Sequence, residues 1–161
     1  MTMNKATFST AIDDRYLDDY IAGATYEFGD IAVDAEEIIS FAERYDPQDI
    51  HTDPAAAAMG PFGGIIASGW QTCGLVMRLC VEHYLSRVAS IASPGIDELR
   101  WLKPVRPGDR LSLRVTVVEV LPSRSKPDRG ILRSLIEVLN QDSEVVMTMV
   151  AMNMLLRRKV V

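Results

Sequence analysis

The sequence has few cysteines and histidines, and it has no long apolar run free of charge. Its two cysteines, Cys73 and Cys80, are predicted on one helix, where their backbones would lie roughly 10 Å apart, too far for a disulfide bond. Two histidines without a Cys-x-x-Cys pair are too few ligands for a zinc site, so we expect no metal and no other cofactor. Arg78 and Glu82 interrupt the most apolar stretch, which leaves no candidate for a membrane-spanning helix.

Basic side chains are also in the minority. The chain has 17 Lys plus Arg against 22 Asp plus Glu, a net charge of −5, which opposes the electrostatic attraction behind most nucleic-acid binding. Lys5 near the start is not followed by an apolar run, so no secretory or transit signal is indicated. We expect a soluble, cytoplasmic protein that binds neither nucleic acid nor membranes.

The overall composition is that of an ordinary globular domain, with 48% hydrophobic and 24% charged residues. A length of 161 residues fits about one domain. A chain of this length can form a hydrophobic core without disulfide bonds or a structural metal ion. We find no internal repeat, low-complexity tract or linker, so we expect a single domain.

The first half predicts helices. Asp34 is placed to cap a helix over about residues 35–44, which should end at Asp46 because Pro47 disfavours helical geometry in the residue before it. A turn-rich segment follows, with a possible single helical turn over residues 55–58. From residue 65 to about 85 the sequence is apolar on nearly every side, which predicts a long buried helix at the centre of the fold.

The second half predicts strands. Apolar and polar residues alternate over 111–117, and similar strands are expected over about 96–102, 131–139 and 145–156, forming an antiparallel meander. Strands that follow helices, without alternating with them, indicate an α+β fold, here a curved sheet around the central helix. Such a sheet covers the helix on one side only, so the remaining apolar surface and the strand edges favour a homodimer.

Two features of the turn-rich segment could carry chemistry. Asp46 and His51 lie five residues apart, and a carboxylate with a neutral imidazole can jointly hold and deprotonate a water. Asp46 before Pro47 also ends a helix, so spacing alone leaves a structural role open. The glycine-rich run from Pro61 to Trp70 leads into the central helix. Free amides at a helix start favour a developing negative charge, although the same glycines could let the helix pass close to neighbouring backbone.

Together these features resemble the MaoC-like dehydratases, also called (R)-specific enoyl-CoA hydratases. Their pattern Asp-x-Asn-Pro-x-His is followed, 18 residues after the histidine, by a glycine at the start of the central helix, and Asp46, His51 and Gly69 keep both intervals. The resemblance covers residues 23–156, which gives one MaoC-like hot-dog domain over residues 1–161 with 1–22 as an N-terminal extension.

The sequence departs from the family pattern at three positions. Gln48 stands where the pattern has Asn, and Asp49 where it has Pro. Ser68 replaces a histidine that often precedes the helix glycine. The hydrogen bonding around Asp46 must therefore differ from that of the best-known hydratases.

The resemblance implies a hot-dog fold, with an antiparallel sheet wrapped around a long central helix, and a dimer whose two sheets join. It implies that Asp46 and His51 are catalytic and hold the water added to a 2-enoyl thioester, while the Gly69 amide forms the oxyanion hole. The activity would be the reversible hydration of a 2-enoyl-CoA to a 3-hydroxyacyl-CoA without a cofactor. Substrate contacts are expected from Gln48, Phe62, Gly63, Gly64, Ser68 and Trp70, and contacts to coenzyme A phosphates from Arg106, Arg124 and Lys126.

Two alternatives stay open from the sequence. A hot-dog acyl-CoA thioesterase would direct the water to the carbonyl carbon and release a free thiol. A non-catalytic acyl-thioester-binding subunit would bind the thioester without turnover.

Overall fold

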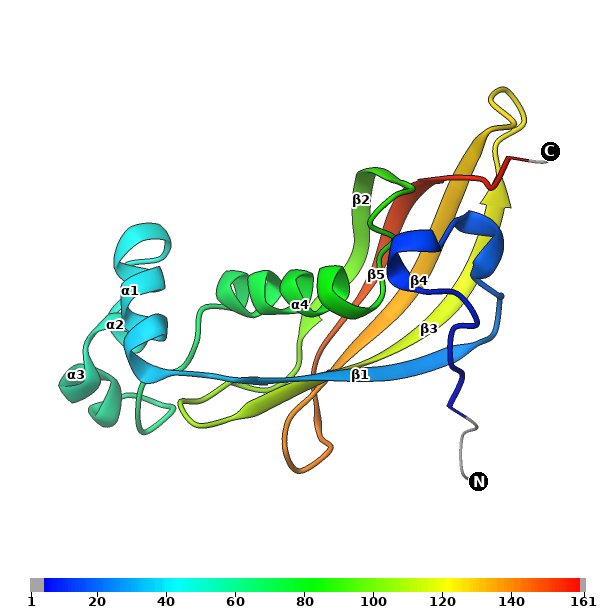
Figure 1. The fold of residues 1–161 in the computed structure, drawn as a ribbon. Helices are drawn as coiled ribbons and strands as arrows, with labels where there is room; N and C mark the ends of the chain where they lie inside the picture. The colour runs from blue at the N-terminus through cyan, green and yellow to red at the C-terminus, as the bar shows by residue number, and fades with distance from the viewer. Residues whose placement is uncertain (1–4, 160–161) are drawn as a thin grey trace.

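The computed structural model describes residues 5–159 of the chain (Figure 1). The helical elements are the 3₁₀ helices η1 (Ile12–Asp14) and η2 (Leu17–Asp19) and the α-helices α1 (Ala35–Tyr45), α2 (Asp49–Thr52), α3 (Pro54–Met59) and α4 (Gly69–His83). The strands are β1 (Thr25–Ala32), β2 (Ser90–Trp101), β3 (Arg110–Pro122), β4 (Arg129–Leu139) and β5 (Val145–Leu156). No helix within residues 5–159 is long and apolar enough to cross a bilayer.

The strands form one antiparallel sheet in the order β1-β3-β4-β5-β2. The predicted meander is confirmed for β3, β4 and β5, but it is wrong for β2, which pairs with β5 and not with β3. The reason is that β1 already occupies the other edge of β3. The periodicity did not predict β1, because Gly29 at φ +86° and a register shift between Phe28 and Ile31 interrupt its alternation.

Helix α4 lies in the bend of this sheet (Figure 1). Its inner side, with Val76, Leu79 and Cys80, joins the core cluster together with inward residues of the strands, among them Leu113 and Val138. A sheet wrapped around a central helix is the hot-dog arrangement. The predicted α+β class is therefore confirmed.

Helix α4 starts later than predicted. Ser68 is its N-cap, and residues 65–68 run outside the helix. The N–H of Ile66 donates to the carbonyl of Ile50 (3.0 Å) and that of Ala67 to the carbonyl of Val105 (2.8 Å). The predicted start at residue 65 is wrong because these amides bond to neighbouring segments and not within a helical turn.

One face of α4 is exposed in the single chain, as expected for a helix that the sheet covers on one side only. Trp70, Met77 and Val81 are 62%, 49% and 46% exposed, and their spacing places them along one stripe of the helix. The neighbouring edge strand β2 exposes Ile91 and Ile96. A sheet that curves around one helix leaves this side uncovered.

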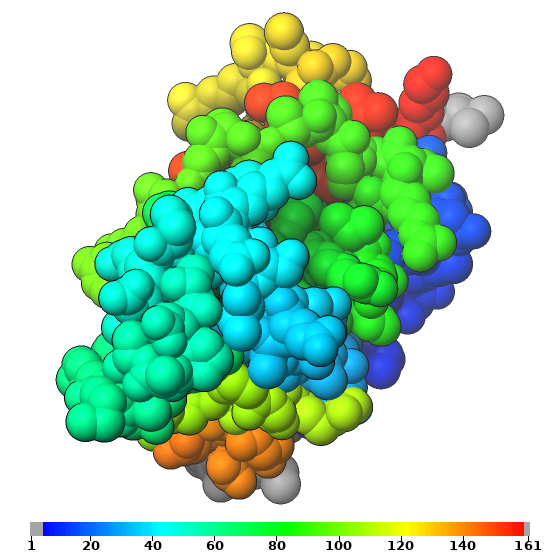
Figure 2. Space-filling view, turned by 90° about the vertical axis from the view of Figure 1, so that its left-hand side faces the viewer, coloured from blue at the N-terminus to red at the C-terminus, as the bar shows by residue number. Residues whose placement is uncertain are grey.

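Helices α1, α2 and α3 gather beyond the N-terminal end of α4 (Figure 1), and Figure 2 looks at this end of the molecule. The predicted first helix is confirmed, with the Asp34 carboxylate accepting from the N–H groups of Glu36 and Glu37. Helix α2 was not predicted, and the predicted turn over 55–58 is part of the longer α3. Asp53 caps α3. Short helices here replace what sequence reasoning took for a loop.

Candidate active site

Asp46 and His51 meet at the corner between α1 and α2. Asp46 is the C-cap of α1, its N–H bonded to the carbonyl of Ala42, and Pro47 then turns the chain. His51 belongs to α2 and is 5% exposed. Its Nε2 lies 3.3 Å from Oδ2 of Asp46. The structure thus brings the predicted catalytic pair together.

The other ring nitrogen of His51 fixes the form of the imidazole. Nδ1 lies 2.7 Å from the carbonyl oxygen of Ile66. Because a carbonyl can only accept, Nδ1 carries a hydrogen, and in the neutral ring Nε2 has the free lone pair. That lone pair is on the side of Asp46.

Two donors hold the Asp46 carboxylate. Nε2 of Gln48 donates to Oδ1 (2.6 Å) and Oγ of Ser68 donates to Oδ2 (2.7 Å). Both hydrogen bonds favour the charged form, so they hold the pKa of Asp46 below its ordinary value. The bond from Gln48 has the larger effect, and the bond from Ser68 follows. When the His51 ring is in its neutral form, Oδ2 and Nε2 are two acceptors side by side, an arrangement suited to a water that donates to both.

Gly69 supplies the amide at the start of α4. A first-turn N–H has no partner inside its helix, and among residues 5–159 the structure gives the Gly69 N–H none elsewhere, whereas the N–H of Trp70 bonds to Oγ of Ser68. Trp101 Nε1 donates to the Gly69 carbonyl (3.1 Å). A Cβ at position 69 would lie 2.5 Å from that nitrogen, so only glycine fits beneath the indole.

These groups line one pocket of about 370 Å³, within the range of small-molecule sites. Asp46, His51 and Gly69 share it with Phe62, Trp70 and Trp101. The remaining lining residues are Ile66, Ala67, Thr72, Leu102, Lys103, Pro104 and Val105. A carboxylate, an imidazole and a free amide thus open into a largely apolar hollow.

The other predicted site residues lie in different places. Gln48 and Ser68 hold Asp46 and do not line the pocket. Gly63 and Gly64 follow Phe62 in its loop and do not line it either. Of the predicted substrate contacts, Gln48 and Ser68 instead support the predicted catalytic pair by their bonds to Asp46.

The three predicted phosphate contacts do not converge in the single chain. Nη1 of Arg106 donates to the Phe62 carbonyl (2.8 Å) and ties that loop beside the pocket. Arg124 and Lys126 lie in the hairpin between β3 and β4, at the end away from α1–α3 (Figure 1). The contact between Trp101 and Gly69 was not predicted, since nothing in the sequence links the two positions.

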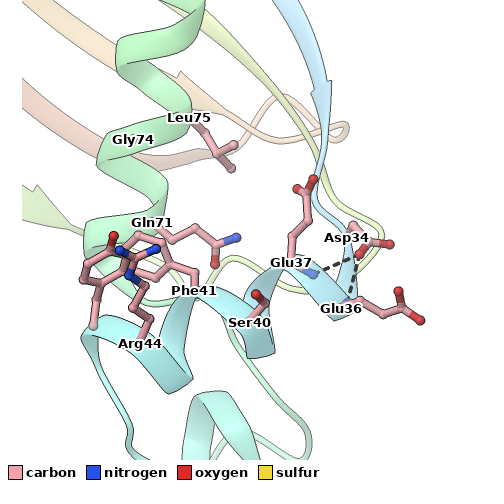
Figure 3. A pocket seen from close by; sticks show the side chains of 10 residues that line it. Asp34, Glu36, Glu37, Ser40, Phe41, Arg44, Gln71, Gly74 and Leu75 are labelled. Carbon is pink, nitrogen blue, oxygen red and sulfur yellow. Dashed lines mark hydrogen bonds between the residues drawn. The ribbon is translucent and has the colours of Figure 1, made fainter.

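A larger hollow of about 690 Å³ lies between α1 and α4 (Figure 3). It is open and lined by Asp34, Glu36, Glu37, Ser40, Phe41, Arg44, Tyr45, Gln71, Gly74 and Leu75. Neither Asp46, His51 nor Gly69 reaches it. Within residues 5–159 no group of three or more His, Cys, Asp or Glu side chains is placed to hold a metal ion.

The antiparallel sheet curved around the central helix defines a hot-dog protein. The family described as MaoC like domain matches residues 20–137, and the chain belongs to this family of MaoC-like dehydratases. A solved MaoC-like dehydratase from Rhodospirillum rubrum is 38% identical, with a TM-score of 0.83 over 91% of this chain and 99% of that one.

The curated relatives include proteins named as dehydratases. A 3-hydroxybutyryl-CoA dehydratase from Methylorubrum extorquens is 31% identical over 69% of each chain. A 3-hydroxyacyl-thioester dehydratase Z from Mycobacterium tuberculosis is 36% identical over 56% of this chain, and the match spans 61% of that relative. The site described above lies within the family match.

Proposed function

We propose that this protein reversibly hydrates a 2-enoyl thioester to a 3-hydroxyacyl thioester. The observation that carries the proposal is that the Asp46–His51 pair and the free Gly69 amide open into one pocket. The dehydratase names of the relatives support the same reaction class. The proposed roles match what this addition needs: two neighbouring acceptors that could hold a water and take its proton, and an amide donor for the thioester oxygen.

In the forward direction the water oxygen forms a bond to the β-carbon while the Asp46–His51 pair takes one proton. The electron pair of the double bond moves toward the thioester carbonyl, whose oxygen becomes negative. The Gly69 N–H donates to that oxygen, and a preorganised donor of this kind contributes roughly 3 kcal/mol because it strengthens as charge develops. The pair then returns a proton to the α-carbon, so the enzyme ends unchanged.

The apolar side of the pocket suits the acyl portion of the substrate. Phe62, Trp70 and Trp101 are large, partly exposed and on the rim. Arg106 donates to the carbonyl of Phe62 and so lies beside the pocket. We assign it, with Arg124 and Lys126, to the phosphates of a coenzyme A carrier.

We also propose a homodimer. The exposed stripe of α4 and the outer edge of β2 form adjoining apolar surfaces, and an exposed strand edge is a template for pairing with another chain. A second copy would cover both. The hairpin with Arg124 and Lys126 lies away from its own pocket, so contact with a bound carrier would come from the partner. Light scattering of the purified protein tests this, and a monomer at all concentrations would refute it.

The function is tested by mixing the protein with crotonyl-CoA and with longer and branched 2-enoyl-CoAs. Enoyl absorbance and free thiol are followed in parallel. Loss of absorbance without thiol release is expected. Thiol release would make the protein a thioesterase, and thioester binding without turnover would make it a binding subunit.

A further inference from the structure

Ser68 joins the helix start to the catalytic carboxylate. It is fully buried, and its Oγ accepts from the N–H of Trp70 (3.3 Å). Its own hydrogen is therefore directed to another acceptor, which is Oδ2 of Asp46 at 2.7 Å. This is the Asp46 oxygen that faces Nε2 of His51.

Gln48 approaches the same carboxylate from the other side. Its amide donates to Oδ1 of Asp46 at 2.6 Å, and its side chain makes no capping bond to α2, although Gln48 is the N-cap residue of that helix. The side chain is exposed and has no core to fill. Among residues 5–159, the Gln48 side chain thus forms a hydrogen bond only to Asp46.

We propose that Ser68 and Gln48 are positioning residues that keep Asp46 ionised and turn its Oδ2 toward His51. The proposal rests on the hydration reaction above for its kinetic consequences, but not for its physical basis. A carboxylate with one donor on each oxygen cannot rotate about its bond to the chain without breaking both bonds. It also loses more when it is protonated than a carboxylate that faces only water.

The direct test is a pH titration of the Asp46 carboxyl carbon by NMR in the full-length protein. Ser68→Ala and Gln48→Leu should each raise the midpoint by about half to one pH unit, because each removes a donor to the charged form. Ser40→Ala is the matched control, since Ser40 is exposed on α1 and does not touch Asp46. Midpoints unchanged from the wild type in both variants would overturn the proposal.

Activity gives a second readout. The acidic limb of kcat/KM for crotonyl-CoA should move to higher pH in the same two variants, with kcat reduced roughly tenfold and KM little changed. Ser68→Thr keeps the hydroxyl and should restore the profile. An acidic limb that stays in place in both variants would contradict the proposal.

The two variants also separate positioning from folding. Ser68→Ala removes a helix cap and should lower the melting temperature, whereas Gln48→Leu removes no cap and should leave it nearly unchanged. A shifted midpoint in Gln48→Leu at wild-type stability therefore supports positioning. If the wild type hydrates no thioester, the proposed function fails, but the NMR titration still decides the role of these residues.

Discussion

The two ends of α4 differ in whether their unpaired backbone groups find hydrogen-bond partners. Every helix leaves unpaired N–H groups at its start and unpaired carbonyls at its end. At the C-terminal end, the buried guanidinium of Arg15 donates to the carbonyls of His83 (3.1 Å) and Tyr84 (2.9 Å), and the Tyr20 hydroxyl donates to the Tyr84 carbonyl as well (2.7 Å). The protein satisfies this end from its own N-terminal segment.

Aromatic rings then seal that end. Phe8, Tyr20, Tyr26, Phe28 and Tyr84 pack with ring centroids 4.0–6.1 Å apart. Burial raises the pKa of Tyr20 to about 12 and that of Tyr84 further in the same direction, so both phenols remain neutral donors. Residues of the predicted N-terminal extension thus belong to the core.

The N-terminal end of α4 is left open. Ser68 takes the Trp70 N–H, but the Gly69 N–H points to no protein acceptor within residues 5–159 and borders a pocket with a charged carboxylate. At one end of the helix the polar groups are used within the fold, and we propose that the other end keeps its polar groups for a ligand. Variants at the open end should therefore change activity, and variants at the sealed end should change stability.

The largest effect is expected from Asp46→Asn. Removing the carboxylate charge should lower the rate of crotonyl-CoA hydration by about 10³-fold, because the pair loses its charged acceptor and can no longer hold and deprotonate the water jointly. The melting temperature should change little. Asp49→Asn, an exposed neighbour at the start of α2, is the control and should keep full activity. Equal losses of activity in both variants would show that the reaction does not specifically require the Asp46 carboxylate.

Gly69→Ala sharpens the comparison within α4 itself. The added Cβ would collide with the Trp101 ring and displace the Gly69 amide, so kcat should fall by about a hundredfold. Gly74→Ala on the same helix has open space around its Cβ and should keep kcat. Unchanged kcat in Gly69→Ala would exclude this amide as the oxyanion donor.

At the sealed end, Arg15→Met should lower the free energy of unfolding by roughly 3 kcal/mol, because buried carbonyls lose a charged donor. Denaturant titration measures the loss, and kcat of the folded fraction should stay at the wild-type value. Arg87→Met, exposed near the same helix end, should have almost no effect. A loss of kcat without a loss of stability in Arg15→Met would contradict the claim that the C-terminal end of α4 serves stability and the N-terminal end serves activity.

Tyr84→Phe should have the smallest effect. It removes the hydrogen bond to Oγ of Ser134 (2.8 Å), which is fully buried, and should cost about 1–2 kcal/mol of unfolding free energy with no change in kcat. Tyr45→Phe, at an exposed tyrosine, is the control. Equal stability of the two variants would argue against a satisfied polar network at this end.

Local patterns sufficed for much of the fold. The Asp34 cap and the alternation in β3, β4 and β5 predicted these elements because each is decided by near neighbours in the sequence. The start of α4 was misplaced because Ile66 and Ala67 are as apolar as helix residues, and only their bonds to Ile50 and Val105 keep them extended.

The site divides in the same way. The resemblance to the MaoC-like pattern, carried by the intervals between Asp46, His51 and Gly69, implied the pair and the amide that share the pocket. The carbonyl of Ile66, which fixes the His51 tautomer, has no signature because every residue carries one. The place of Trp101 over Gly69 depends on how β2 packs against α4, which residue type does not reveal.

The central claim is that one pair of groups, on one side of the pocket, both takes the proton from water and gives one to the α-carbon. Hydration of crotonyl-CoA in D₂O, with the product analysed by NMR, tests it most directly. The account predicts one deuterium at the α-carbon on the same face as the new hydroxyl. Deuterium on the opposite face, or equally on both, would contradict it.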